Sequence, residues 1–129
     1  MSTIIEKFGR ICVPLKKYVG VFELKDCLFS KSQFILTFDV DWVPDFIMEP
    51  VIKTLKTNKL KSTWFVTHQS DILDELQNDE LFEFGIHPNF RNGSSHGDTP
   101  DQVLASMKRI VPRAQSVRSH GLLQSSDIL

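Results

Sequence analysis

The sequence contains little of what marks secreted or membrane proteins. Its 129 residues include two cysteines, Cys12 and Cys27, which are too few for a disulfide framework and are predicted to be buried thiols in a reducing cytosol. Its apolar runs are far shorter than the roughly 20 residues that span a bilayer. The short apolar run at residues 3–5 is followed at once by Glu6 and Lys7, unlike a signal peptide. These absences predict a cytoplasmic protein with no membrane span.

An excess of positive charge is also absent. Fifteen lysines and arginines stand against 16 aspartates and glutamates, so the net charge is −1. Because general nucleic-acid-binding proteins usually carry a basic excess, no nucleic-acid partner is expected. The 41% of hydrophobic residues is typical of a globular chain. The length predicts a single domain, residues 1–129, in which residues 1–32 form an N-terminal cap or hairpin and residues 33–129 form the main fold.

Strand-like and helix-like segments alternate in the main fold. The predicted strands, rich in β-branched and aromatic residues, are residues 34–40, 62–67, 81–86 and 115–118. The predicted helices are residues 44–58, residues 70–77, and a third helix that begins at Thr99–Pro100 and is stopped by Pro112. This alternation predicts an α/β fold of parallel βα units. Four such units cannot close an eight-stranded barrel, so they form either an open sheet or the N-terminal part of a larger fold.

Residues that can titrate or bind a metal follow every predicted strand. They are Asp39 and Asp41 after the first strand, His68 after the second, His87 and the loop residue His96 after the third, and Arg118 and His120 after the fourth. All four histidines of the chain belong to this set. In parallel α/β proteins the carboxyl ends of the strands meet at one edge, where the chemistry takes place. The pattern therefore predicts a functional site at that edge.

Asp39 and Asp41 are two residues apart, so both side chains should project from the same face of the strand. Two carboxylates held close together repel each other unless a cation neutralises them. A divalent metal bound by aspartate and histidine would do so, and a set of two imidazoles and one carboxylate leaves room for water, as in catalytic sites. The alternative is that both aspartates cap the following helix and that His87 lies on the surface.

Other catalytic chemistries have weaker support. Ser119 precedes His120 without the Gly-x-Ser-x-Gly turn of a serine hydrolase. The first predicted strand is followed by Trp42, Val43 and Pro44, where a phosphate-binding loop would need glycine. Metal-dependent chemistry is therefore the main prediction.

The motifs at these strand ends resemble the polysaccharide deacetylase family of carbohydrate esterases. Thr-Phe-Asp-Val-Asp-Trp at residues 37–42 is similar to the first motif of that family, in a variant with a spacer residue. Ser-Thr-Trp-Phe-Val-Thr at residues 62–67 resembles its second strand, and Glu-Phe-Gly-Ile-His-Pro at residues 83–88 resembles the strand that delivers its first metal histidine. Arg118 resembles the arginine of its third motif. The resemblance covers roughly residues 34–120.

This resemblance implies a distorted (β/α) barrel, of which the chain would be the N-terminal part. It also implies a divalent metal, usually zinc, and removal of an acetyl group from an N-acetylated sugar or oligosaccharide. By the same resemblance, Asp41 and His87 would be metal ligands and Asp39 the general base. Arg118 would orient Asp39 and balance its charge, and a histidine would protonate the departing amine.

Two departures from the family pattern affect the site. The second metal histidine of the family lies four residues after the first, but that position holds Arg91. We therefore assign His96 as the third ligand, because its glycine-flanked loop can fold back toward His87. The late motifs, which supply the acetyl pocket and the general acid, have no counterpart, so His120 is the candidate acid and His68 its alternative. Which of His96, His68 and His120 completes the metal site stays open.

Two other functions are kept beside the deacetylase. The chain could be an inactive or partial deacetylase-like module that binds carbohydrate or a partner protein. It could also be another metal-dependent hydrolase, such as a phosphodiesterase, that uses the same aspartate and histidine ligands. The sequence does not indicate the sugar, its linkage or the oligomeric state.

Overall fold

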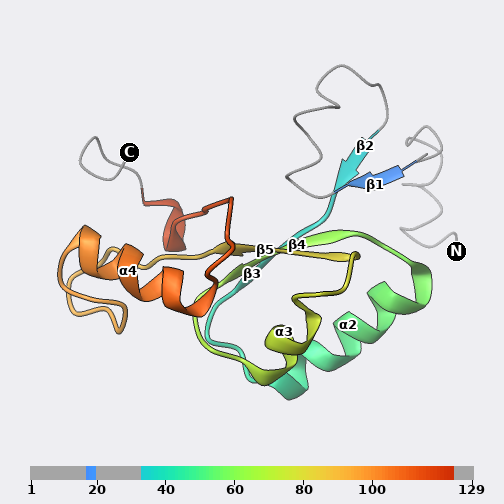
Figure 1. Cartoon of the computed structure of the whole chain (residues 1–129), viewed down its shortest axis with the longest axis horizontal. Coiled ribbons are helices and arrows are strands. Elements are labelled where there is room, and N and C mark those ends of the chain that lie inside the picture. The colour runs from blue at the N-terminus through green and yellow to red at the C-terminus, as the bar shows by residue number, and fades with distance from the viewer. Residues whose placement is uncertain (1–16, 20–32, 124–129) are drawn as a thin grey trace, which may run out of the picture.

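The computed structural model describes residues 17–19 and 33–123. In chain order its elements are β1 (Lys17–Val19), β2 (Gln33–Ile35), β3 (Thr37–Val40), α2 (Asp45–Asn58), β4 (Ser62–Val66), α3 (Asp71–Leu76), β5 (Phe82–Ile86), α4 (Pro100–Ile110) and the 3-10 turn η2 (His120–Leu122). Figure 1 shows α2 and α3 side by side on one face of the sheet that β3, β4 and β5 form. The predicted alternation of strands and helices is confirmed.

The three central strands are parallel, as predicted, in the order β3-β4-β5. In register, Asp39 pairs with Phe65 of β4, and Phe65 pairs with Gly85 of β5. Parallel pairing brings the carboxyl ends of all three strands to the same edge, where Asp41 and His87 follow β3 and β5 directly. The sheet therefore places the predicted site residues together.

The predicted fourth strand, residues 115–118, is wrong as a strand and is reduced to one parallel bridge between Ile86 and Val117. Two backbone hydrogen bonds make this bridge: Ile86 N–H donates to Ser116 O over 3.0 Å, and Arg118 N–H donates to Ile86 O over 3.1 Å. The next donor in a parallel ladder would be the N–H of residue 88, but Pro88 has none. The ladder resumes only where His120 N–H donates to Pro88 O over 2.9 Å.

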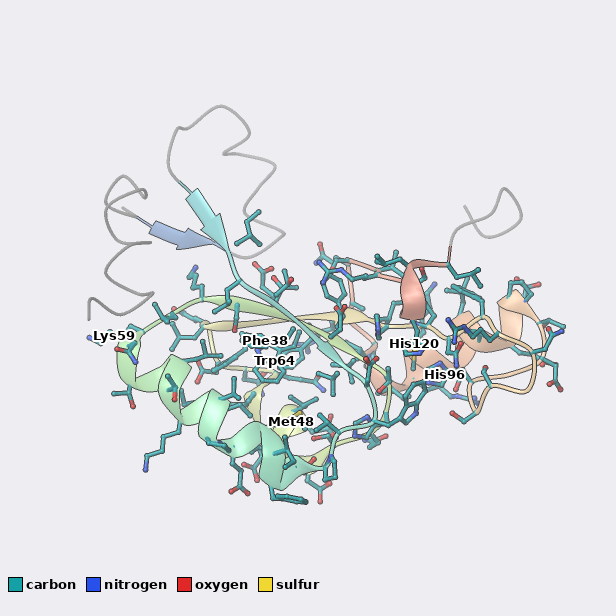
Figure 2. The ribbon with its side chains drawn as sticks, turned by 180° about the vertical axis from the view of Figure 1, so that it is seen from behind. Phe38, Met48, Lys59, Trp64, His96 and His120 are labelled. Carbon is teal, nitrogen blue, oxygen red and sulfur yellow. The ribbon has the colours of Figure 1, made fainter. Side chains whose placement is uncertain are left out.

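The core lies between the sheet and α2. Trp64 of β4 stacks on Phe38 with ring centroids 4.6 Å apart, and its indole N–H is satisfied by Ser62 Oγ at 2.9 Å. Met48 and Ile52 are buried on the facing side of α2, and Figure 2 shows Phe38, Trp64 and Met48 in this layer. The helix runs through Pro50 without ending, although this proline lacks the N–H of a regular helix. This shared apolar layer holds the sheet against α2.

Side-chain caps fix where the two later helices begin. Ser70 Oγ accepts the Leu73 N–H over 3.3 Å at the start of α3, and Thr99 Oγ1 accepts the Gln102 N–H over 3.3 Å at the start of α4. Both helices begin within one residue of the predicted starts, residue 70 and Thr99–Pro100. The caps fix the points where the loops after β4 and β5 end.

The N-terminal expectation lies mostly outside the described residues. The predicted cap or hairpin of residues 1–32 is described only at β1, which pairs parallel with β2, Lys17 opposite Gln33. None of the helices in the described part of the chain is long and apolar enough to cross a membrane.

Candidate metal centre

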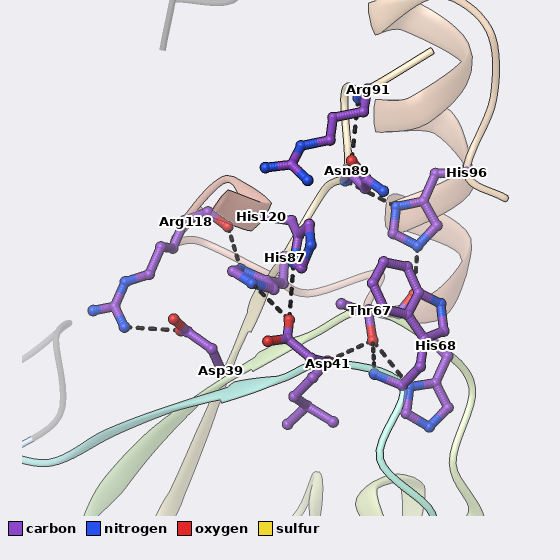
Figure 3. Close-up of polar contacts among 12 residues, drawn as sticks. Asp39, Asp41, Thr67, His68, His87, Asn89, Arg91, His96, Arg118 and His120 are labelled. Atoms are coloured by element: carbon purple, nitrogen blue, oxygen red, sulfur yellow. Dashed lines mark hydrogen bonds and ion pairs between the residues drawn. The ribbon is translucent and has the colours of Figure 1, made fainter. Parts of the chain in front are cut away.

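Asp41, His87 and His120 form a compact group at the carboxyl edge of the sheet. Their candidate ligand atoms all lie within 4.8 Å of one another (Figure 3). Asp41 Oδ1 is 3.2 Å from His87 Nε2 and 2.9 Å from His120 Nδ1. His87 is almost completely buried, whereas Asp41 is exposed. One carboxylate oxygen therefore faces two imidazole nitrogens at the surface of the molecule.

A single hydrogen bond sets the proton position on His87. Its Nδ1 lies 2.6 Å from the backbone carbonyl oxygen of Arg118, which can only accept. The proton of the neutral ring therefore lies on Nδ1, and Nε2 turns its lone pair toward Asp41. The carbonyl of Arg118 is available because Pro88, opposite it in the ladder, has no N–H to donate.

The chemistry of this donor set fits a divalent cation. With its proton on Nδ1, His87 directs a lone pair at a carboxylate oxygen 3.2 Å away, and two lone pairs repel unless a proton or a cation lies between them. Zinc binds nitrogen and oxygen at about 2.0 to 2.2 Å in a tetrahedral arrangement, which spaces the donors by about 3.3 Å. The distances of 2.9 and 3.2 Å are close to that spacing. Asp41, His87 and His120 would hold such an ion.

Asp39 lies beside this group but has a different partner. Arg118 donates from Nη1 to Asp39 Oδ1 over 2.8 Å and to Thr37 Oγ1 over 3.1 Å. Its guanidinium group also lies over the ring of Phe65, 4.3 Å from the centroid. Figure 3 shows the side chains of Asp39 and Asp41 on the same side of the chain at the end of β3, as their spacing predicts. The arginine side chain holds Asp39, while the metal-capable group contains only Asp41.

The side chains of Ser116 and Phe65 leave no space for a side chain at Gly85. A Cβ atom on Gly85 would lie 2.4 Å from Ser116 Oγ and 2.8 Å from Phe65 Cδ1. Any larger residue at this position would displace the Ser116 hydroxyl or the Phe65 ring, over which the Arg118 guanidinium group lies. Gly85 therefore helps to complete the site, although it contributes no side chain to it.

His96, expected from the sequence to be the third ligand, lies outside the group of three. Its Nδ1 accepts the Asn89 N–H over 3.0 Å, and its Nε2 donates to the Thr67 carbonyl oxygen over 2.8 Å. Both ring nitrogens therefore have backbone partners, and the ring is buried. Burial lowers the pKa of His96 below its ordinary value of 6.5, and the nearby His120 and His87 rings lower it further. The structure places His120 where His96 was expected.

Thr67 and Trp42 join the site without having been singled out as site residues from the sequence. The hydroxyl of the fully buried Thr67 donates to Val40 O and accepts the Trp42 N–H over 3.1 Å. His68, the other candidate histidine, contacts the same hydroxyl through Nδ1 at 3.0 Å. The only sequence signal for Thr67 was its hydroxyl at the end of the predicted strand, directly before His68. That position offers a buried donor and acceptor next to the loops of the site.

Comparison with known proteins finds a family and a related fold for this chain. A family model described as WbmS-like polysaccharide deacetylase matches residues 36–129. A crystal structure from Bordetella bronchiseptica, described as a candidate polysaccharide deacetylase involved in O-antigen biosynthesis, matches with a TM-score of 0.77 and 30% identity. The match covers 87% of this chain and 48% of that one, so this chain spans about half the length of the solved protein. No significant match is found among curated proteins.

These findings confirm the resemblance seen in the sequence and the expected α/β class of parallel βα units. The matched region contains Asp39, Asp41, His87 and His120, and it therefore contains the whole site described above. The chain belongs to the WbmS-like polysaccharide deacetylase family.

Proposed function

We propose that this protein is a metal-dependent hydrolase that removes an acetyl group from an N-acetylated sugar, with zinc as the metal. The observation that carries the proposal is the approach of Asp41 Oδ1 to two imidazole nitrogens at 2.9 and 3.2 Å in a member of this family. The role of the Bordetella relative in O-antigen biosynthesis supports a sugar of a surface polysaccharide as the substrate.

Asp41, His87 and His120 are the proposed metal ligands. A zinc ion held by them would supply Lewis-acid activation of the acetyl carbonyl and of water. His120, expected from the sequence to be the general acid, is reassigned to the ligand set because its Nδ1 faces Asp41. The Arg118 carbonyl keeps the Nδ1 proton on His87 and leaves Nε2 free to bind.

Asp39 is the proposed general base. Its Oδ1 is held by Arg118 over 2.8 Å, while its Oδ2 has no partner among residues 33–123. A carboxylate that is fixed at one oxygen and free at the other can accept a proton from water without binding the metal itself. Arg118 balances the charge of Asp39 and holds its orientation.

Metal content and acetate release, measured on the full-length protein, test this function. We expect about one zinc per chain and acetate release from N-acetylglucosamine oligosaccharides that stops with a chelator and returns with zinc. Asp41→Asn should lose both properties. Asp101→Asn, which changes an exposed aspartate in the first turn of α4, is the matched control and should keep both.

Two results would point to another function. Tight zinc binding without acetate release from any N-acetylated sugar would favour a carbohydrate-binding or interaction module. Hydrolysis of a generic phosphodiester in place of an acetamide would favour a phosphodiesterase with the same ligands.

A further inference from the structure

The backbone of Trp42 adopts a conformation that is unusual for a large side chain. Its φ is +53°, in the left-handed region that non-glycine residues seldom enter. Lys59 has a similar φ, but it is the C-cap of α2, where this conformation is common. Trp42 is not the C-cap of a helix. It lies between β3 and α2 and directly follows Asp41. Strain of this kind persists only where the surroundings hold it, and it is concentrated at functional sites.

The hydroxyl of Thr67 holds this conformation. It accepts the Trp42 N–H over 3.1 Å and donates its own proton to Val40 O, so it contacts the backbone on both sides of Asp41. Thr67 is 1% exposed, so no water competes for these hydrogen bonds. The turn that carries Asp41 and Trp42 is therefore fixed to the end of β4.

The indole ring of Trp42 contacts two histidines. Its centroid is 5.3 Å from that of His96, with the two rings inclined by 32°, and 5.3 Å from that of His120, which it meets edge-on at 77°. His96 is fixed by hydrogen bonds at both ring nitrogens. The indole therefore packs on the immobilised ring of His96, and the fixed indole in turn restrains the His120 ring.

Within the described part of the chain, His120 has no hydrogen bond that could orient its ring from behind. Histidines that bind metals usually donate their second ring N–H to a carbonyl or carboxylate, as His87 does to Arg118. Among residues 33–123, Nε2 of His120 has no such partner. The His120 ring instead lies beside two other rings. Its centroid is 5.4 Å from that of His87 and 5.3 Å from that of Trp42. Aromatic contacts occupy the place of the missing hydrogen bond.

We propose that Trp42 is a positioning residue, which holds the His120 ring with Nδ1 toward Asp41. The metal-binding consequence rests on the proposed function, while the orientation of His120 does not require a metal. Thr67 and His96 support this role, because Thr67 fixes the backbone of Trp42 and His96 fixes its indole ring.

Substitutions can separate the ring of Trp42 from its backbone. Trp42→Gly removes the indole, but glycine adopts a φ of +53° freely and keeps the N–H that donates to Thr67. Thr67→Val removes the acceptor while keeping the shape, and Thr67→Ser restores it. Phe46→Ala is the matched control, because Phe46 is an exposed aromatic residue of α2 with no ring contact among the described residues.

The first readout is the NMR spectrum of the metal-free protein. We expect nuclear Overhauser contacts between the His120 and Trp42 rings in the parent, in Phe46→Ala and in Thr67→Ser. They should weaken or vanish in Thr67→Val. In Trp42→Gly the His120 ring signals should show averaging over several orientations. An ordered, unshifted His120 ring in Trp42→Gly would overturn the proposal.

The second readout is zinc affinity. Loss of a group that orients a metal ligand typically weakens binding 10- to 100-fold, so Trp42→Gly should lose about tenfold and Phe46→Ala nothing. Unchanged affinity in Trp42→Gly with a lowered unfolding temperature would show a structural role only, and would overturn the positioning role. If the parent binds no zinc but His120 is disordered by Trp42→Gly, the positioning role stands and the metal centre is wrong.

Discussion

The backbone carbonyl of Arg118 accepts the Nδ1 proton of His87 over 2.6 Å, while the guanidinium group of the same arginine binds Asp39 over 2.8 Å. One residue thus contacts a proposed metal ligand through its main chain and the proposed base through its side chain. Because the main-chain contact survives substitution, the two tasks can be separated by experiment.

Replacing Arg118 with methionine should affect catalysis and leave metal binding intact. The aliphatic chain of methionine keeps contact with Phe65, and the carbonyl that holds His87 is unchanged. We expect parent zinc content and a fall in turnover of about tenfold or more, because Asp39 loses the group that orients it. Arg113→Met, at an exposed arginine without an ion pair in the described region, is the control. Loss of zinc from Arg118→Met would contradict the division of roles.

Asp39 of β3 and Asp41, which follows this strand, should respond differently to the same change. Asp39→Asn should keep zinc, because the shape and the ligand set are preserved, while acetate release falls by roughly a hundredfold or more. Asp41→Asn should weaken zinc binding itself. Zinc content and turnover measured on both variants check this expectation. Zinc lost from Asp39→Asn but kept in Asp41→Asn would reverse the two roles.

His120 and His96 should differ in their effect on the metal. His120→Ala removes a ligand, so we expect loss of stoichiometric zinc and, with Co²⁺ as the probe, a changed visible absorption spectrum. His96→Gln should keep one metal per chain and the parent cobalt band positions, although its affinity falls because Trp42 loses its support. A cobalt spectrum altered in His96→Gln but not in His120→Ala would restore His96 to the ligand set.

Acid should destabilise the protein through His96. Because burial holds its pKa below the ordinary 6.5, the unfolded chain binds more protons than the folded one below that pH. The contribution of His96 to the free energy of unfolding is therefore complete above about pH 6.5 and is lost as the pH falls through the lowered pKa. Urea unfolding of the metal-free protein between pH 5 and 8 should show this loss in the parent and a shallower slope in His96→Gln. Equal slopes would remove His96 as the cause.

The parallel sheet was predictable because segments rich in β-branched and aromatic residues alternate with segments of helical pattern. The same alternation correctly placed Asp41 and His87 at one edge. The strand at residues 115–118 was overestimated, because a local pattern cannot show that Pro88 interrupts the hydrogen-bond ladder on the facing strand. That interruption depends on the pairing of two segments about 30 residues apart.

The choice between His96 and His120 lay beyond the sequence for a similar reason. Both residues follow predicted strands, and the carboxyl ends of parallel strands meet at the edge of the sheet where His87 lies. Only the fold shows that the Asn89 N–H and the Thr67 carbonyl occupy both nitrogens of His96. Trp42 was passed over because its unusual backbone conformation has no signature in residue type.

Proline at position 88 acts through an atom that it does not have. In a regular ladder the N–H of residue 88 would donate to Arg118 O, and the strand would continue with every backbone group paired. Because Pro88 has no N–H, the carbonyl oxygen of Arg118 has no backbone donor, and His87 donates its Nδ1 proton to that oxygen instead. An otherwise conservative Pro88→Ala exchange would therefore lengthen the sheet and make a backbone amide compete with His87 for one carbonyl. At this edge of the sheet, the carbonyl oxygen of Arg118 can either extend the ladder or hold the proton on Nδ1 of His87.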